Sequence, residues 1–110
     1  MPISPIMAVK GSPEPTVTVT SSDEAQTLED AGVTIVLDER NAVGVLITIE
    51  DANIRFTLGD VDEIVPTDAV GHILYAGQSL RLDSPRAIRT FQFISDVVQS
   101  VPVMHVTTEF

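Results

Sequence analysis

The sequence contains no cysteine, no tryptophan and only one tyrosine among its 110 residues. Without cysteine it can form neither a disulfide nor a thiolate metal site, which fits synthesis in a reducing cytoplasm. Without tryptophan it lacks the aromatic platforms on which carbohydrate-binding modules stack sugars. It has no apolar run near the roughly 20 residues of a membrane helix, and its proline-interrupted start is unlike a signal peptide. We therefore expect no membrane span.

Basic residues are also scarce. Sixteen acidic residues stand against six basic ones, which gives a net charge of -10, and the acids are spread from Glu14 to Glu109. Binding to DNA or RNA requires a Lys/Arg footprint that releases counterions from the phosphate backbone. The charge balance therefore predicts a protein that does not bind nucleic acid.

Four of the six basic residues fall in one part of the chain, on expected solvent-facing positions or turns: Arg55, Arg81, Arg86 and Arg89. Two interpretations are open. The plainer one is ordinary surface pairing with Asp and Glu, which is how most such charges are used. The sharper one is an arginine-bearing patch that docks on an acidic partner.

The chain divides into an arm, residues 1–15, and a single folded domain, residues 16–110, because 110 residues suffice for one core and not for two. Four prolines in the arm prevent a helix and cannot donate to a central strand, so we expect an extended segment. Burying a large apolar side chain is worth roughly 1.5–3 kcal/mol. We therefore expect the arm to dock on a neighbouring subunit or another protein through its apolar residues, Ile3, Ile6, Met7 and Val9.

Apolar and polar residues alternate with a period of two through much of the domain, which is typical of half-buried strands. The expected strands are residues 16–20, 25–30, 33–37, 43–49, 54–59, 80–82, 87–94 and 103–110. Residues 38–41 form a polar loop, and residues 43–49, apolar on both faces, form the most central strand, covered on each side.

Two of these segments are ambiguous. Residues 25–30 form either one helical turn capped near Ser22 or a short edge strand, and we favour the strand. Residues 87–94 place Arg89 on the same face as Phe91 and Phe93, so a bulge or two covered faces are expected there.

Many short strands with turn signals between them and no convincing helix predict an antiparallel β-sandwich or a small barrel. We favour an all-β fold: a single antiparallel, jelly-roll-like β-sandwich of about eight short strands with an extended N-terminal arm. The phenylalanines Phe56, Phe91 and Phe93 are expected in its core.

Candidate chemistry is thin. Four carboxylates, Asp60, Asp62, Glu63 and Asp68, could gather Ca²⁺, but the loop lacks the ligand spacing and glycine of a calcium motif, so a solvated loop is favoured. His72 is expected to cap a turn at the entry to a strand, and His105 to lie on an outward or interface face. No serine stands in a nucleophile-elbow context. We therefore expect no enzyme, with no catalytic residue, metal or cofactor.

A strand, a Pro-Thr loop, a Gly-His pair and an Ala-Gly-Gln turn follow one another as Ile54-Arg55-Phe56-Thr57-Leu58-Gly59, Pro66-Thr67-Asp68, Gly71-His72-Ile73-Leu74 and Ala76-Gly77-Gln78. The chain then closes on Ile88, Phe91, Phe93, Ile94 and a final Val/Thr strand. This order resembles the small β-sandwich virion proteins of tailed bacteriophages. The resemblance covers residues 43–110 well and the first 40 poorly. Where that family usually has Asp-Gly before Pro-Thr, this chain has Gly59-Asp60 and then residues 61–65.

The resemblance implies a structural protein on the capsid surface of a virion, made in the host cytoplasm, that decorates or cements the shell or belongs to a head fibre. Its implied partner is the major capsid protein or another virion protein. A homo-oligomer is expected, with a trimer preferred because decoration proteins often sit on local threefold axes. The threonine face of residues 16–20, together with Met104 and Phe110, also favours an oligomer. The alternative is a tail- or fibre-associated recognition module for a host-surface receptor or glycan.

Overall fold

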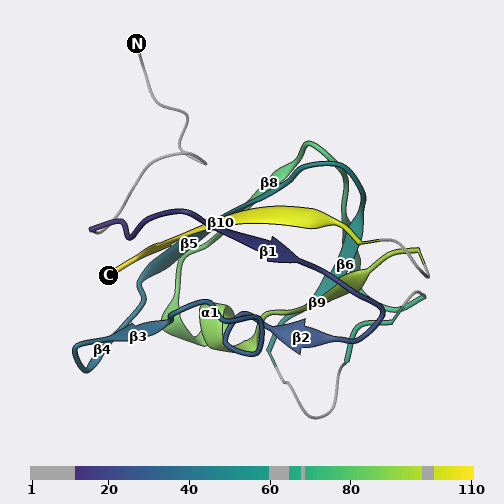
Figure 1. Ribbon diagram of the computed structural model, residues 1–110. Helices are drawn as coiled ribbons and strands as arrows, with labels where there is room; N and C mark the ends of the chain where they lie inside the picture. The colour runs from purple at the N-terminus through teal and green to yellow at the C-terminus, as the bar shows by residue number, and fades with distance from the viewer. Residues whose placement is uncertain (1–11, 60–64, 68, 98–100) are drawn as a thin grey trace.

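All strand pairs in this computed structural model are antiparallel within the residues that it describes, which are 12–59, 65–67, 69–97 and 101–110 (Figure 1). Sheet A has the strand order β1 (Val17–Thr20), β10 (Val103–Glu109), β5 (Gly44–Ile49) and β8 (Ser79–Leu82). Sheet B has the order β2 (Gln26–Thr27), β9 (Gln92–Ser95), β6 (Ile54–Thr57) and β7 (His72–Leu74). A separate hairpin joins β3 (Val36–Leu37) to β4 (Arg40–Asn41). The expectation of a mainly β, antiparallel protein is confirmed.

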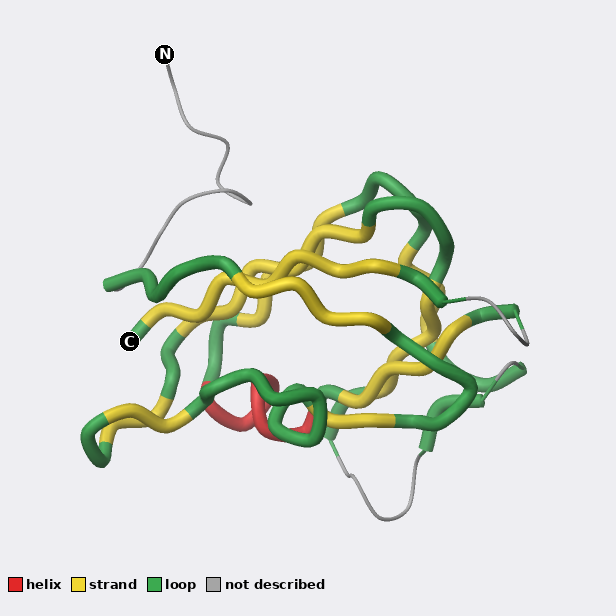
Figure 2. Tube along the Cα trace, in the orientation of Figure 1, coloured by secondary structure: helices red, strands yellow, loops and turns green. Residues whose placement is uncertain are grey.

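The hydrophobic core takes side chains from both sheets. Strand β5 points Val45, Ile47 and Ile49 inward, where all three are fully buried, while the alternate residues Leu46 and Thr48 are half-buried on the other face. The remaining core side chains of the two sheets include Val19, Met104, Val106, Leu82, Ile54, Phe56, Leu74 and Phe93. Figure 2 shows the strands as two groups, with helix α1 (Pro85–Thr90) beside the lower group. The prediction that residues 43–49 form an inner strand is confirmed, because β5 pairs with β10 on one side and β8 on the other. Strand β10 is equally inner, and the outer face of β5 is only half-buried, so the predicted cover on both faces is wrong.

The prediction of one strand over residues 87–94 is wrong at its start. Helix α1 (Pro85–Thr90) precedes β9, and so the expectation of no helix is also wrong. The Ser84 side chain accepts a hydrogen bond from the Ala87 N–H at 3.1 Å, and Pro85 occupies the first turn. The side-chain cap and the φ of proline, which already suits a helix, both favour a helical turn here. They outweigh the apolar alternation, which favours a strand. Arg89 therefore lies on the helix, away from a strand face shared with Phe91 and Phe93.

Residues 25–30 combine both interpretations of the sequence. Gln26 and Thr27 form β2, and residues 27–32 then make a hydrogen-bonded turn. The turn ends at Gly32, whose φ is 89°, with Val33 N–H donating to Leu28 O at 2.9 Å and Gly32 N–H donating to Glu29 O at 3.0 Å. This bonding pattern is the Schellman motif, which needs the left-handed conformation that glycine adopts easily.

The polar loop predicted at residues 38–41 is a tight hairpin turn. Asp38 and Glu39 have φ values of 50° and 66°, and the next two residues form β4. A two-residue hairpin turn of type I′ requires positive φ at both central residues, and aspartate tolerates this better than most side chains. The strand expected at residues 33–37 is correspondingly shortened to β3.

Residues 12–14, at the end of the predicted arm, are hydrogen-bonded to the end of the chain. Ser12 and Phe110 exchange two backbone bonds of 3.1 and 3.0 Å, and Glu14 N–H donates to Thr108 O at 2.8 Å. The rest of the arm, including Ile3, Ile6, Met7 and Val9, lies outside the described residues. The body therefore holds the arm from residue 12 onward.

A buried ion pair ties three strands of sheet A together. The Arg81 guanidinium of β8 donates to both carboxylate oxygens of Glu109 in β10, each at 2.7 Å, and to Asp83 at 2.7 Å. The side chains of Arg81 and Glu109 are only 6% and 1% exposed. The pair crosses over Gly44 of β5, where a Cβ would lie 2.7 Å from Arg81 Nη2. The hydrogen bonds that Arg81 donates to Glu109 raise the pKa of Arg81, so the guanidinium stays charged.

We expect Glu109→Gln to lower the free energy of unfolding by about 3 kcal/mol, the lower end of the range for removing one partner of a buried pair. Asp83 still pairs with Arg81, which limits the loss. The matched control is Glu50→Gln, which breaks the exposed pair with His105 and should change stability by less than about 1 kcal/mol. Urea unfolding followed by circular dichroism measures both, and equal losses would contradict the assignment.

Candidate functional site

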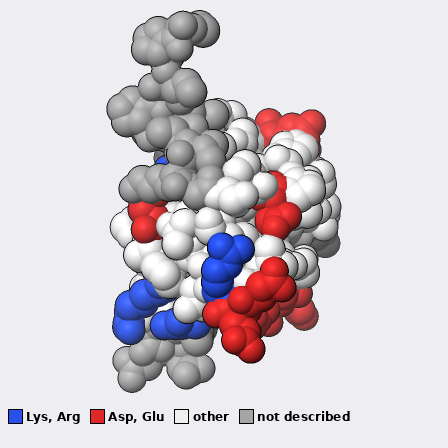
Figure 3. Space-filling view, turned by 90° about the vertical axis from the view of Figure 1, so that its left-hand side faces the viewer, with Lys and Arg blue, Asp and Glu red and all other residues white. Residues whose placement is uncertain are grey.

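The structure distributes the four arginines of the predicted patch over several environments. Arg55 of β6 pairs with Asp96 at 2.7 Å and donates to the Gly71 carbonyl at 3.2 Å. Arg81 is buried in the pair described above, so its predicted solvent-facing position is wrong. Arg86 donates to the Gly59 carbonyl at 3.0 Å, and Arg89 is exposed on the same helix. On the face seen in Figure 3, basic side chains stand next to acidic ones.

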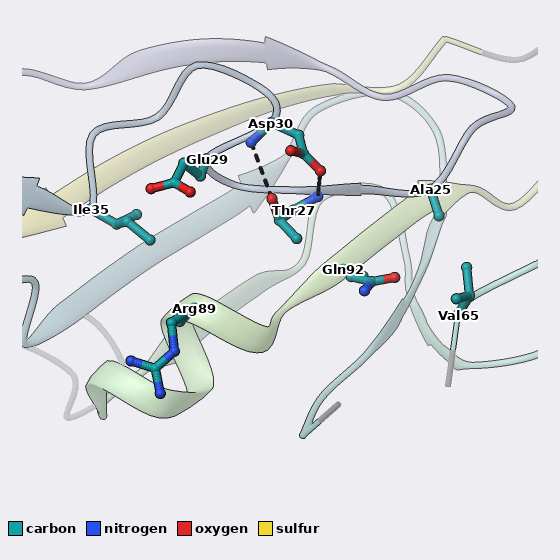
Figure 4. A pocket seen from close by; sticks show the side chains of 8 residues that line it. All are labelled: Ala25, Thr27, Glu29, Asp30, Ile35, Val65, Arg89 and Gln92. Atoms are coloured by element: carbon teal, nitrogen blue, oxygen red, sulfur yellow. Dashed lines mark hydrogen bonds between the residues drawn. The ribbon is translucent and has the colours of Figure 1, made fainter. Parts of the chain in front are cut away.

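Arg89 lines an open groove on the described surface. This groove of about 530 Å³, which we call the α1 groove, lies between α1 and the turn of residues 27–32 (Figure 4). Its lining is Ala25, Thr27, Glu29, Asp30, Ile35, Val65, Arg89 and Gln92. A smaller hollow of about 90 Å³ shares Glu29, Ile35 and Arg89 with it, and so continues the groove along the helix.

Two capped turns form the walls of the α1 groove. On one wall, Thr27 N–H donates to Asp30 Oδ2 and Asp30 N–H donates to Thr27 Oγ1, both at 3.1 Å. This reciprocal pair holds Glu29 at the rim (Figure 4). On the other wall, the Ser84 cap starts α1 and thereby places Arg89 in its last turn. The Thr27–Asp30 bonds therefore position Glu29 on one wall, and the Ser84 cap positions Arg89 on the other.

The charges on the two rims are unequal. Glu29 and Asp30 lie on one wall and Arg89 on the other, and the apolar side chains of Ile35 and Val65 line the groove at its opposite ends. Within the described part of the chain, the side chains of Glu29 and Arg89 make no hydrogen bond or ion pair, whereas Asp30 caps Thr27. The groove therefore has apolar contact area and two charged groups available to a ligand.

The histidines lie apart, one on each sheet. His105 of β10 has Nε2 3.0 Å from Glu50 Oε2, on the outward face as predicted. His72 begins β7, with its ring 5.3 Å from that of Phe56, and lines a separate hollow with Leu58 and Val70. No group of three His, Cys, Asp or Glu residues within the described ranges is arranged to hold a metal ion. The acidic loop with Asp60, Asp62, Glu63 and Asp68 lies outside those ranges.

Sequence reasoning missed the α1 groove. Its signals were the spacing of Thr27 and Asp30, the glycine that ends their turn, and the Ser84-Pro85 start of α1. Each is a local capping pattern, but which walls come together depends on how β2 pairs with β9. Among the described residues, no helix has the length and apolar character needed to span a membrane.

No protein-family model, curated protein or solved structure matches the chain. The features that bear on its class are therefore its antiparallel strands, the order of its turns and its apolar arm.

We expect Thr27→Ala to lower the free energy of unfolding by about 1 kcal/mol, because it removes the side-chain cap of the groove wall. Arg89→Ala should change stability by less than about 0.5 kcal/mol, since its side chain is exposed and has no described partner. Urea unfolding of the two variants checks this. A loss on Arg89→Ala as large as that on Thr27→Ala would mean that Arg89 supports the fold.

Proposed function

We propose that the chain is a structural virion protein of a tailed phage that decorates or cements the capsid through protein–protein contacts, and that it is not an enzyme. We also propose that its two four-stranded sheets form a jelly-roll-like β-sandwich. The Ala76-Gly77-Gln78 motif, on which the resemblance partly rests, supports the proposal because its residues form a hydrogen-bonded turn. Tyr75 O accepts from Gln78 N–H at 3.0 Å, and Gly77 has a φ of 83°, as a type II turn requires.

The arm's anchorage is the observation that carries the proposal. Ser12 and Glu14 are bonded to the end of β10, so the residues before them begin at a fixed point on the body. Residues 1–13 contain no acid and one base, Lys10, whereas all 16 acids of the chain follow them. An acid-free, apolar and proline-rich segment can lie along a groove or sheet edge of a partner, with little entropy to lose. The major capsid protein, or another virion protein, is the partner that we propose.

A homo-oligomer remains part of the proposal, and the trimer follows from the resemblance alone. Met104, one of the residues that favoured an oligomer, is fully buried in the core of a single chain. It therefore needs no partner. Phe110 is half-buried and packs against the same core, whereas Thr16, Thr18 and Thr20 are exposed.

One observation favours the alternative, a tail- or fibre-associated module that binds a host-surface receptor or glycan. The α1 groove offers Glu29 and Arg89 to a ligand. Against it, the chain has a single tyrosine and no tryptophan on which sugars could stack.

Deleting residues 1–11 should leave a folded body and abolish its incorporation into particles. This cut keeps both bonds between Ser12 and Phe110. Circular dichroism checks the fold, and co-sedimentation with phage particles assembled without the protein measures binding. The matched full-length control replaces the four large apolar residues of the arm by serine and should also fail to bind. Full occupancy of the particles by the deletion variant would show that the arm does not bind them. The exposed Arg86 and Arg89 would then be the next residues to test for binding.

The two functions differ in their target. Labelled full-length protein should bind particles that lack it and should not bind host cells. Binding to cells that is lost on Arg89→Glu, with no binding to particles, would instead support the recognition module, because that change makes the α1 groove wholly acidic.

A further inference from the structure

Strand β1 is an outer strand of sheet A, and among the described residues no strand pairs with its outer edge. Antiparallel strands alternate residues that exchange both backbone bonds with the partner strand and residues whose N–H and C=O point away from it. Ser21 N–H donates to Pro102 O at 2.8 Å, in the same register that pairs Val17 with Val106. Val17 and Val19 therefore bond to β10, and the backbone groups of Thr18 and Thr20 point outward. None of these outward groups has a backbone partner within the described residues.

The open stretch has defined ends. At one end, Pro15 has no N–H with which to donate a hydrogen bond. Pro15 and Thr16 also form a β-bulge, because both lie opposite the single residue Thr107. At the other end, the Ser22 carbonyl already accepts from Ser95 N–H at 2.9 Å. The free edge therefore covers residues 16–20, and Thr18 is its centre.

The other edges within the described sheets are protected or short. On β8, Ile49 N–H donates to Gln78 O at 3.0 Å, so the residues that point outward are Ser79, Arg81 and Asp83. The exposed charge of Asp83 at the end of this edge discourages pairing with another chain. Strand β7 has three residues and β2 has two. Residues 16–20 are Thr-Val-Thr-Val-Thr, without charge or proline, and Val17 is 42% exposed.

We propose that this edge pairs with the same edge of a second copy, antiparallel and about a two-fold axis at Thr18. Thr18 then faces Thr18 of the second copy, and Thr20 faces Thr16, so that every outward backbone group is satisfied. The two copies of sheet A become one continuous sheet, and Val17 is partly covered by Val19 of the second copy. A self-complementary contact of this kind closes as a dimer. It is independent of the capsid proposal, and a trimer would require a different surface.

The contact is small and its ends are acidic. One strand pair buries less than the roughly 1,200 Å² of a stable complex, so the dimer should form reversibly as concentration rises. In this register Glu14 of one copy approaches Asp23 of the other, and each chain carries a net charge of -10. Salt screens such repulsion. Association should therefore strengthen with ionic strength.

Hydrogen exchange of the unmodified protein provides the first test. At low concentration the amides of Val17 and Val19 should be protected, and those of Thr18 and Thr20 should exchange fast. At high concentration and high salt, Thr18 and Thr20 should slow at least tenfold while sedimentation shows a dimer of 11.8 kDa chains. If the two threonine amides exchange equally fast in the monomer and in the associated state, the proposal fails, whatever the oligomer.

Cysteine cross-linking tests the register, because the chain has no cysteine of its own. In the proposed dimer the two Thr18 Cα atoms lie about 5.5 Å apart, within disulfide range. Thr18→Cys should therefore cross-link under mild oxidation. The two Thr16 positions are four residues out of register, about 14 Å apart, so Thr16→Cys alone should not cross-link.

A mixture of Thr16→Cys and Thr20→Cys chains should cross-link, because those positions face each other. Ser79→Cys, on the opposite edge and the same face of sheet A, is the matched control and should remain monomeric. Cross-linking of Ser79→Cys to the same extent as Thr18→Cys, or of neither, would overturn the two-fold contact. Retained protection of the Val19 amide shows that each variant is folded.

Discussion

The position of β10 between β1 and β5 is the constraint on which the rest of the structure depends. Its inward residues, Met104 and Val106, belong to the core. Glu109 holds Arg81 across Gly44, and Phe110 holds Ser12. The same strand thus stabilises sheet A, fixes where the arm meets the body and leaves β1 as an outer strand. Both proposed interactions, through the arm and through the β1 edge, begin from residues that β10 positions.

Strands with strict alternation were predictable because one buried face leaves a period-two pattern in the sequence. Residues 16–20 show that pattern and contain β1. Residues 43–49 were predictable in another way, as a run that is apolar on both faces, and they contain the inner strand β5. Residues 87–94 were predicted wrongly. Their apolar pattern resembles that of a strand, but Ser84 and Pro85, just before them, favour a helical turn. The local cap decided the structure there.

The sites were harder to predict than the strands, because they depend on register. Nothing near Arg81 in the sequence indicates Glu109 as its partner. The two meet only because β5 lies between their strands and has a glycine at the crossing point. The α1 groove likewise needs the pairing of β2 with β9 to bring the wall with Glu29 opposite Arg89. A pattern within one segment carries no information about such long-range neighbours.

The inner position of β10 also has a consequence for synthesis in the cell. Ribosomes release residues 17–20 and 44–49 well before residues 103–109, so β1 and β5 must wait for the strand that separates them. Until β10 inserts, both have unpaired edges and exposed apolar faces, which is the state in which nascent chains aggregate. Contacts between residues so distant in sequence also form slowly. Changes that delay this insertion therefore reduce the yield of soluble protein, even when the folded domain is no less stable.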